Sequence, residues 1–301
     1  MTKEHMKQEL KVAIVQTTLD KKVAWKKVDK GQTIKMDFAE AARVWREIIN
    51  TFDNYINLEE SRKPEIVLLP ELSVAEIFEP EIKKLAEQTG CIVITGLDFI
   101  SKERIVENKA LVAIPFGWPL GSGHSRSKTF YFGKYFPAAE EKKYIEDCGK
   151  KFSSCDQFYL LDAREYGRIG LAICADFYDI ERFALYKGRI QHLFILAYNK
   201  DIKSFNYLCE AISRLVYCNV VICNTGHYGG SVCFSLKDKD WKRYIYRHEG
   251  SDLFTSQIVR LPVKDFYEAQ SNPSASHPKE FKNPPPGYKW QYKNNVNDKK
   301  D

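Results

Sequence analysis

The sequence lacks any run of about 18 consecutive apolar residues, which is the length that a membrane-spanning helix needs. Its first ten residues are mostly polar or charged and have no apolar middle of the kind that marks a secretory signal peptide. We therefore expect a soluble, intracellular protein that works in the cytoplasm and does not have a membrane as its partner.

Paired cysteines are also missing. The eight cysteines are dispersed, none belongs to a Cys-x-x-Cys pair, and most lie inside apolar runs, as buried thiols do. We therefore expect neither a disulfide framework nor a structural zinc site, and the sequence predicts no metal ligands.

The main part of the chain also lacks an excess of basic residues. The formal net charge is +6, but residues 20–36 carry six Lys against two Asp, and residues 271–301 carry six Lys against three acidic residues. The rest of the chain is close to neutral, so the basic excess lies in two polar segments, which are more often solvated than bound to nucleic acid. Nucleic acid is therefore an unlikely partner for the body of the domain.

Apolar runs divide the chain into alternating strands and helices. Strands are predicted at 11–17, 66–69 and 91–96, separated by a long amphipathic helix over 36–60 and a second helix over 79–88 that Gly90 ends. This order implies a layered α/β fold. Later strands are predicted at 106–115, 157–161, 168–173, 190–198, 220–224, 232–235 and 257–263, and later helices at 180–186 and 203–217.

Three reactive side chains stand at or just past strand ends: Glu71, Lys134 and Cys174. A thiol with a pKa of ~8.5 is mostly protonated at neutral pH and needs a neighbouring base or cation to attack as a thiolate. Glu71 can take the proton, and the Lys134 ammonium can stabilise the anion that forms on an attacked carbonyl or nitrile. A lone cysteine in a strand is usually just a buried side chain, so the prediction of a nucleophilic site rests on the three residues together.

Four short motifs carry a family resemblance. They are Leu69-Pro70-Glu71, then Lys134-Tyr135-Phe136-Pro137 followed by Glu141, then Gly170 to Asp176, and finally Asn224-Thr225-Gly226 through Gly229-Gly230-Ser231. In this order the sequence resembles the carbon–nitrogen hydrolases of the nitrilase superfamily, over roughly residues 10–265. Each motif alone is weak, whereas the four together form a strong joint signal.

The resemblance implies an α/β fold that is a four-layer α-β-β-α sandwich of two mixed β-sheets, assembled as a homodimer or higher homo-oligomer. It implies that Cys174 attacks an amide or nitrile carbon, that Glu71 acts as general base and then acid, and that Lys134 holds the tetrahedral intermediate. Water then hydrolyses the thioester, and Glu141 is similar to an additional glutamate that orients the site. No metal or organic cofactor is implied, and the expected partner is a small-molecule substrate, an amide more often than a nitrile.

Some assignments have competitors. Lys128 competes with Lys134, because some family members show Lys-Thr followed by an apolar residue, but the Pro and Glu that follow Lys134 favour the latter. His124 and His227 raise the alternative of a cysteine–histidine protease. Asp176 is expected to cap the helix that follows it.

The substrate pocket is the least readable part of the sequence. Its candidates are Ala175, Asn224 and His227, of which the last lies in a glycine-rich loop. Ala175 stands where relatives often carry Trp or Tyr, so the sequence leaves the substrate open.

The predicted organisation has three parts. An N-terminal extension occupies 1–10, a carbon–nitrogen hydrolase-like domain occupies 11–269 with a Lys-rich insertion at about 20–36, and a polar, Pro-rich tail at 270–301 is expected to be disordered or a linker. The alternative function is a nitrilase-like module for assembly or partner binding. Domains of this family also occur fused to other modules, including reverse transcriptase-type polymerases, and the tail would suit a linker in such a longer protein.

Overall fold

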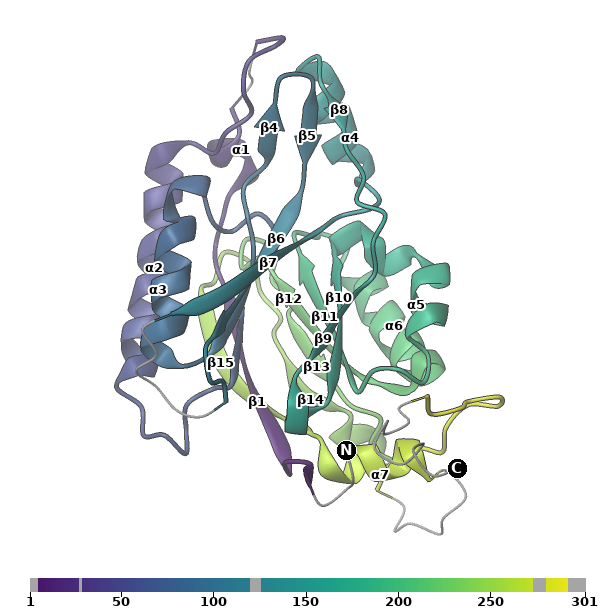
Figure 1. The fold of residues 1–301 in the computed structure, drawn as a ribbon. Coiled ribbons are helices and arrows are strands. Elements are labelled where there is room, and N and C mark those ends of the chain that lie inside the picture. Colours follow the sequence, from purple (N-terminus) through teal and green to yellow (C-terminus); the bar gives the residue numbers. More distant parts are fainter. Residues whose placement is uncertain (1–4, 27–28, 120–125, 273–279, 292–301) are drawn as a thin grey trace, which may run out of the picture.

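Two six-stranded sheets face each other at the centre of the molecule, with a small three-stranded sheet at one end (Figure 1). The computed structural model describes residues 5–26, 29–119, 126–272 and 280–291. No helix within these ranges is long and apolar enough to cross a membrane.

The first sheet is parallel at its centre and antiparallel toward both edges. Helices α2 (Phe38–Ile56) and α3 (Glu79–Thr89) lie along its outer side (Figure 1). Gly90 ends α3 in a left-handed conformation, as the sequence predicts. The strands, in order across the sheet, are β15 (Thr255–Pro262), β1 (Glu9–Gln16), β2 (Ile66–Leu68), β3 (Ile92–Gly96), β6 (Lys109–Pro115) and β7 (Ser127–Gly133).

The second sheet repeats this pattern, with parallel strands at its centre and antiparallel strands outside them. Helices α5 (Ile180–Tyr186) and α6 (Ile202–Ile212) lie along its outer side (Figure 1), and a π-helical turn, Ser213–Tyr217, continues α6. The strands, in order, are β14 (Tyr244–Arg247), β13 (Val232–Phe234), β12 (Asn219–Asn224), β11 (His192–Ala197), β10 (Arg168–Ile173) and β9 (Tyr159–Asp162).

The remaining elements are short. The small sheet contains β4 (Ile100–Lys102), β5 (Ile105–Glu107) and β8 (Lys151–Phe152), so the strand predicted over 106–115 is in fact two strands, β5 and β6. The short helices are α1 (Lys21–Ala24), α4 (Ala139–Asp147) and α7 (Lys264–Ser271).

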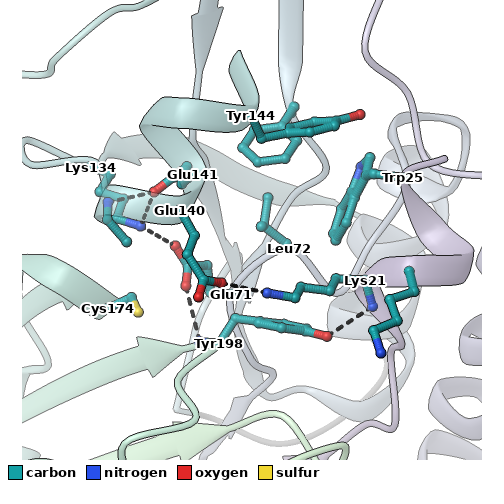
Figure 2. A pocket seen from close by; sticks show the side chains of 13 residues that line it. Lys21, Trp25, Glu71, Leu72, Lys134, Glu140, Glu141, Tyr144, Cys174 and Tyr198 are labelled. Carbon is teal, nitrogen blue, oxygen red and sulfur yellow. Dashed lines mark hydrogen bonds and ion pairs between the residues drawn. The ribbon is translucent and has the colours of Figure 1, made fainter. Parts of the chain in front are cut away.

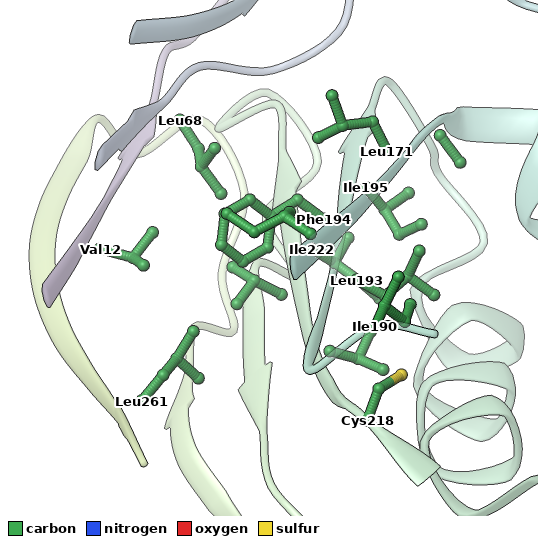
Figure 3. Close-up of a cluster of buried hydrophobic side chains, with 14 of the residues drawn as sticks. Val12, Leu68, Leu171, Ile190, Leu193, Phe194, Ile195, Cys218, Ile222 and Leu261 are labelled. Atoms are coloured by element: carbon green, nitrogen blue, oxygen red, sulfur yellow. The ribbon is translucent and has the colours of Figure 1, made fainter. Parts of the chain in front are cut away.

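The main hydrophobic core lies between the two large sheets. Figure 3 shows Val12 and Leu68 of the first sheet beside Phe194 and Ile222 of the second. Side chains alternate along a strand, so the neighbours of Val12 in β1 point the other way, into a second cluster beneath α2 and α3. The predicted α/β class with two mixed sheets is therefore confirmed.

The Lys-rich segment at 20–36 is not simply a solvated insertion. Asp20 caps α1 by accepting a hydrogen bond from the amide of Lys22, and Ala24, Ile34 and Met36 are buried in the second cluster. Apolar residues placed among the lysines therefore anchor this segment to the body of the protein.

The prediction of a disordered tail is wrong for residues 280–291. Tyr288 is buried and its ring packs edge-on against Tyr217, with ring centroids 5.2 Å apart. The Tyr217 hydroxyl donates a hydrogen bond to the carbonyl of Lys282, and the Gln291 amide donates one to Gly188. Aromatic anchors thus hold this stretch against the core in spite of its polar composition.

Candidate active site

Glu71 stands three residues after the end of β2, where the backbone turns sharply. Leu72 has a φ of +58°, in the left-handed region that non-glycine residues rarely adopt. The turn lies directly against Gly96, where a Cβ atom would come within 2.5 Å of the Glu71 Cα. The absence of a side chain at Gly96 therefore allows the Glu71 turn to sit where it does.

Cys174 directly follows β10 and opens a 3₁₀ helix, Cys174–Tyr178. Its φ is +43°, a strained value for a residue with a side chain, and the residue is only 6% exposed. A sharp turn at the end of a strand separates the side chain from the sheet and presents the thiol to the space beyond it.

Lys134 follows β7 and is fully buried. Its Nζ lies 2.7 Å from Glu71 Oε1 and 2.5 Å from Glu141 Oε2. Glu141, in the first turn of α4, also accepts a hydrogen bond from the amide of Ala138 at the start of that helix. The predicted set of Glu71, Lys134 and Glu141 is therefore one connected cluster, and its ion pairs are shielded from water.

Asn108, which the sequence did not single out, bridges the two carboxylates of this cluster. Its Nδ2 donates to Glu71 Oε1 at 2.8 Å and to Glu141 Oε1 at 2.7 Å. Its backbone carbonyl accepts a hydrogen bond from the Lys134 amide. One asparagine thus fixes the orientation of both carboxylates and the start of the Lys134 loop.

Contrary to the sequence prediction, Asp176 does not cap the following helix but contacts the Lys134 loop. It is buried, and its carboxylate accepts hydrogen bonds from the amides of Tyr135 and Phe136, directly after Lys134. Asp179 caps α5 instead. Asp176 therefore ties the Cys174 turn to the Lys134 loop.

Burial and charge set the protonation states in the cluster. Burial raises the pKa of the Glu71 carboxyl, and the Lys134 ammonium opposes this shift. Burial also raises the pKa of the Cys174 thiol, and the charge of Glu71 raises it further. Burial would lower the pKa of Lys134, but Glu71 and Glu141 raise it well above its usual value. Lys134 is therefore a permanent cation, and Cys174 remains a thiol until a base removes its proton.

These groups lie at one end of a cavity of about 320 Å³. Tyr198, which follows β11, lines the cavity at this end, and its backbone N–H donates a hydrogen bond to Glu71 Oε2 at 3.0 Å. Figure 2 shows Cys174, Lys134 and Glu71 on one side of the cavity, and Trp25 and Tyr144 on the other. The walls are largely apolar and consist of Trp25, Leu72, Phe99, Tyr144 and Tyr198.

The other predicted site residues lie elsewhere. Lys128 is exposed on β7 and does not line the cavity, so Lys134 is the lysine that meets Glu71. Ala175 lines a separate hollow beside Tyr178, and His227 pairs with Asp252 at 2.7 Å. His124 lies outside the described residues.

All the side-chain hydrogen bonds described for Asn224 are with backbone groups. Its side chain donates to the carbonyls of Asn199 and Gly229 and accepts from the amide of Asn199, so it fixes the loop that follows Tyr198. Within the described ranges, no three His, Cys, Asp or Glu side chains are grouped as a metal site requires.

Comparison with solved structures identifies the fold. A CN-hydrolase superfamily protein from Xanthomonas campestris superimposes with a TM-score of 0.60 at 12% identity, covering 88% of this chain and 94% of its own. An amidase from Nesterenkonia sp. gives a TM-score of 0.58 at 13% identity, covering 85% of this chain and 92% of its own. The chain has the carbon–nitrogen hydrolase fold. The predicted resemblance is thus confirmed at the level of the fold.

The carbon–nitrogen hydrolase fold is recognised here by structure and not by sequence similarity. No protein-family profile matches the sequence, and no curated protein matches it. A cysteine-to-serine variant of a Nesterenkonia amidase from the nitrilase superfamily is also similar in structure. Its TM-score is 0.58 at 12% identity, and the match covers 86% of this chain and 94% of that one.

Proposed function

We propose that this protein is a cysteine-dependent hydrolase of non-peptide carbon–nitrogen bonds, acting on small-molecule amides. The observation that carries the proposal is the position of the Cys174 thiol, on a strained turn at the end of a cavity that also holds the buried Glu71–Lys134 ion pair. Nucleophile, base and cation are thereby gathered where a substrate carbonyl can reach them.

The first half of the reaction forms an acyl-enzyme. The Cys174 sulfur attacks the amide carbon as Glu71 takes the thiol proton, and the carbonyl π electrons move onto oxygen. Lys134 stabilises this oxyanion. The intermediate collapses when the carbon–nitrogen bond breaks and Glu71 returns the proton to the leaving amine, which leaves a thioester on Cys174.

The second half regenerates the enzyme. Glu71 takes a proton from water as the water oxygen attacks the thioester carbon, and the carbon–sulfur bond then breaks. The sulfur leaves as a thiolate and recovers a proton from Glu71, which releases the carboxylic acid. Burial suits Glu71 to both roles, because a raised pKa lies closer to neutral pH, where one carboxyl group can both accept a proton and return it.

The solved relatives support this proposal. In one structure of the Nesterenkonia amidase, the acetamide moiety of fluoroacetamide is added covalently at the active-site cysteine. Another variant of that amidase is a complex with acrylamide. Both observations belong to that protein, and they favour an amide over a nitrile as the substrate here.

The decisive test is acylation of Cys174. We expect the purified protein to release ammonium from primary amides, and rapid acid quenching followed by mass spectrometry to find the acyl group on the peptide that contains Cys174. Burial raises the pKa of Glu71. The apparent pKa of the acidic limb in a plot of kcat/KM against pH should therefore lie above the ordinary glutamate value of ~4.3. Amide hydrolysis without any acylated Cys174, in a quench that detects an added thioester standard, would overturn the mechanism.

Asn108→Ala provides a test of how the carboxylates are positioned. The Asn108 amide favours the charged forms of Glu71 and Glu141, so its loss should raise the Glu71 pKa and move the acidic limb to higher pH. We expect kcat to fall by about tenfold or more, corresponding to a charged hydrogen bond of about 1.5–3 kcal/mol.

A matched control for this change exists on the opposite sheet. Asn219 is also a buried asparagine whose Nδ2 makes two contacts, with His192 Nδ1 and the carbonyl of Pro262. Asn219→Ala should lower stability without moving the acidic limb. An unmoved limb in Asn108→Ala, measured by a full pH profile, would assign Asn108 a purely structural role.

A further inference from the structure

The cavity walls present aromatic rings whose polar atoms are already engaged. The Trp25 Nε1 donates to Asp98 Oδ1 at 2.9 Å, and the Trp25 ring packs edge-on against Phe99 with centroids 5.4 Å apart. The Tyr198 hydroxyl donates to the carbonyl of Leu19, and the Tyr144 hydroxyl donates to that of Lys26. These walls therefore offer a ligand ring faces and edges instead of hydrogen bonds.

The solvent-facing end of the cavity has a different character. Lys21 and Lys22, at the start of α1, line it together with Glu140 of α4. Glu140 accepts from Lys21 at 2.6 Å and also pairs with Lys200, so its charge is fully matched. Figure 2 shows the Lys21 and Glu140 side chains reaching toward each other.

Lys22 is the cation that remains for a ligand. Its backbone amide is used in capping α1 through Asp20, but its Nζ makes no hydrogen bond or ion pair within the described ranges. The three lining groups at this end, Lys21, Lys22 and Glu140, sum to a net positive charge. An anionic group on a ligand is therefore favoured there.

From these two observations we infer that the substrates are amides whose acyl group carries an aromatic ring and ends in an anionic group. The amide lies at Cys174, the ring lies against Trp25 and Phe99, and the anion lies beside Lys22. A volume of about 320 Å³ suits one ring with a short chain. This inference rests on the proposed amide hydrolase function and specifies its substrate class.

A matched series of four amides tests the inference: propanamide, 3-phenylpropanamide, 3-(4-carboxyphenyl)propanamide and 3-(4-aminomethylphenyl)propanamide. We expect kcat/KM to be about tenfold or more higher for 3-phenylpropanamide than for propanamide, because the ring fills the apolar walls. The carboxylated amide should exceed the aminomethyl amide by about threefold to tenfold, since the cation at Lys22 is solvent-exposed. This second preference should shrink as salt is added.

Three variants assign the preferences to residues. Trp25→Ala should reduce the ring preference, and Lys22→Glu should remove or reverse the preference for the carboxylate. Lys84→Glu is the matched control, because Lys84 is a similarly exposed lysine on α3 that pairs with Glu81. The control should change neither preference.

The same four amides are also titrated by calorimetry into Cys174→Ala protein, which separates binding from turnover. Tighter binding of the carboxylated amide, weakened by Lys22→Glu, supports the placement of the anionic group beside Lys22. Equal binding of all four amides, or a preference for propanamide or the aminomethyl amide, overturns the substrate class. Such a result leaves the proposed function standing when Cys174 is still acylated, whereas an absence of acylation by every amide overturns the proposed function.

Discussion

Replacing Cys174 by alanine is expected to abolish amide hydrolysis, with a loss in kcat of at least about 10⁴-fold, as for other nucleophiles that act within a catalytic unit. Among the described residues Cys174 is the only cysteine that lines the cavity, so the acyl-enzyme is expected there. The fold should survive, because alanine is close to cysteine in size and meets the same positive φ.

The measurement combines ammonium release with iodoacetamide labelling and thermal unfolding. Cys155→Ser is the control, since Cys155 is the only cysteine in the described ranges that is not buried, and therefore the one most open to labelling besides the cavity-lining Cys174. That variant should retain turnover and lose only labelling at its own position. Hydrolysis at the wild-type rate by folded Cys174→Ala protein is incompatible with the proposed mechanism.

The second large effect is expected from Lys134→Met, which removes the cation from between two buried carboxylates. Methionine fills a similar volume, so the loss comes mainly from the uncompensated charge of Glu71 and Glu141. We expect the free energy of unfolding to fall by about 3–5 kcal/mol. Turnover should be lost as well, because no other lysine ammonium contacts Glu71 in the described part of the chain.

The stability loss should depend on pH in a defined direction. Without Lys134, the main charge that opposes the rise of the Glu71 pKa above its unfolded value of ~4.3 is gone, and only hydrogen bonds such as those from Asn108 and Tyr198 still favour the charged form. The folded state then binds a proton more tightly than the unfolded state, so stability decreases as pH rises through this range. The deficit of Lys134→Met should therefore be smallest near pH 5 and largest near pH 8, as measured by urea denaturation.

Lys150→Met is a matched control for this experiment. Lys150 is also buried, but its ammonium contacts only backbone carbonyls, those of Lys102 and Glu103. Its replacement should cost stability without the same pH dependence. Adding Glu71→Gln to Lys134→Met should recover part of the loss at high pH, and a pH-independent deficit in the single variant would show that packing, not charge, sets the effect.

The sequence predicts the candidate site residues from their positions at strand ends. Glu71 and Cys174 each follow closely on a short apolar strand, and functional groups in α/β folds collect at the carboxyl ends of such strands. The flanking Pro and Glu favour Lys134 over Lys128, and the structure pairs Lys134 with Glu71. The α/β class followed from the same alternation of apolar runs.

Three residues of the cavity and cluster are not predicted from the sequence: Asn108, Trp25 and Tyr198. The first two stand in sequence contexts that give little indication of their place in the site. Asn108 lies between two short strands that the sequence presents as one, so nothing marks it as facing the carboxylates. Trp25 belongs to a segment dominated by lysine, and its place in the cavity wall depends on a contact with Asp98, 73 residues away. Tyr198 follows an apolar strand as Cys174 does, and the same reasoning applied to β11 would have found it.

The residues of the candidate site do not extend from one sheet. Glu71 and Lys134 extend from strands of the first sheet, whereas Cys174 and Tyr198 extend from strands of the second. The relative position of Glu71 and Cys174 therefore depends on how the two sheets pack, through core side chains such as Leu68 and Phe194. If the proposed chemistry holds, we therefore expect substitutions that change the core volume between the sheets to reduce turnover even where the fold survives, because catalysis is sensitive to displacements of about 1 Å.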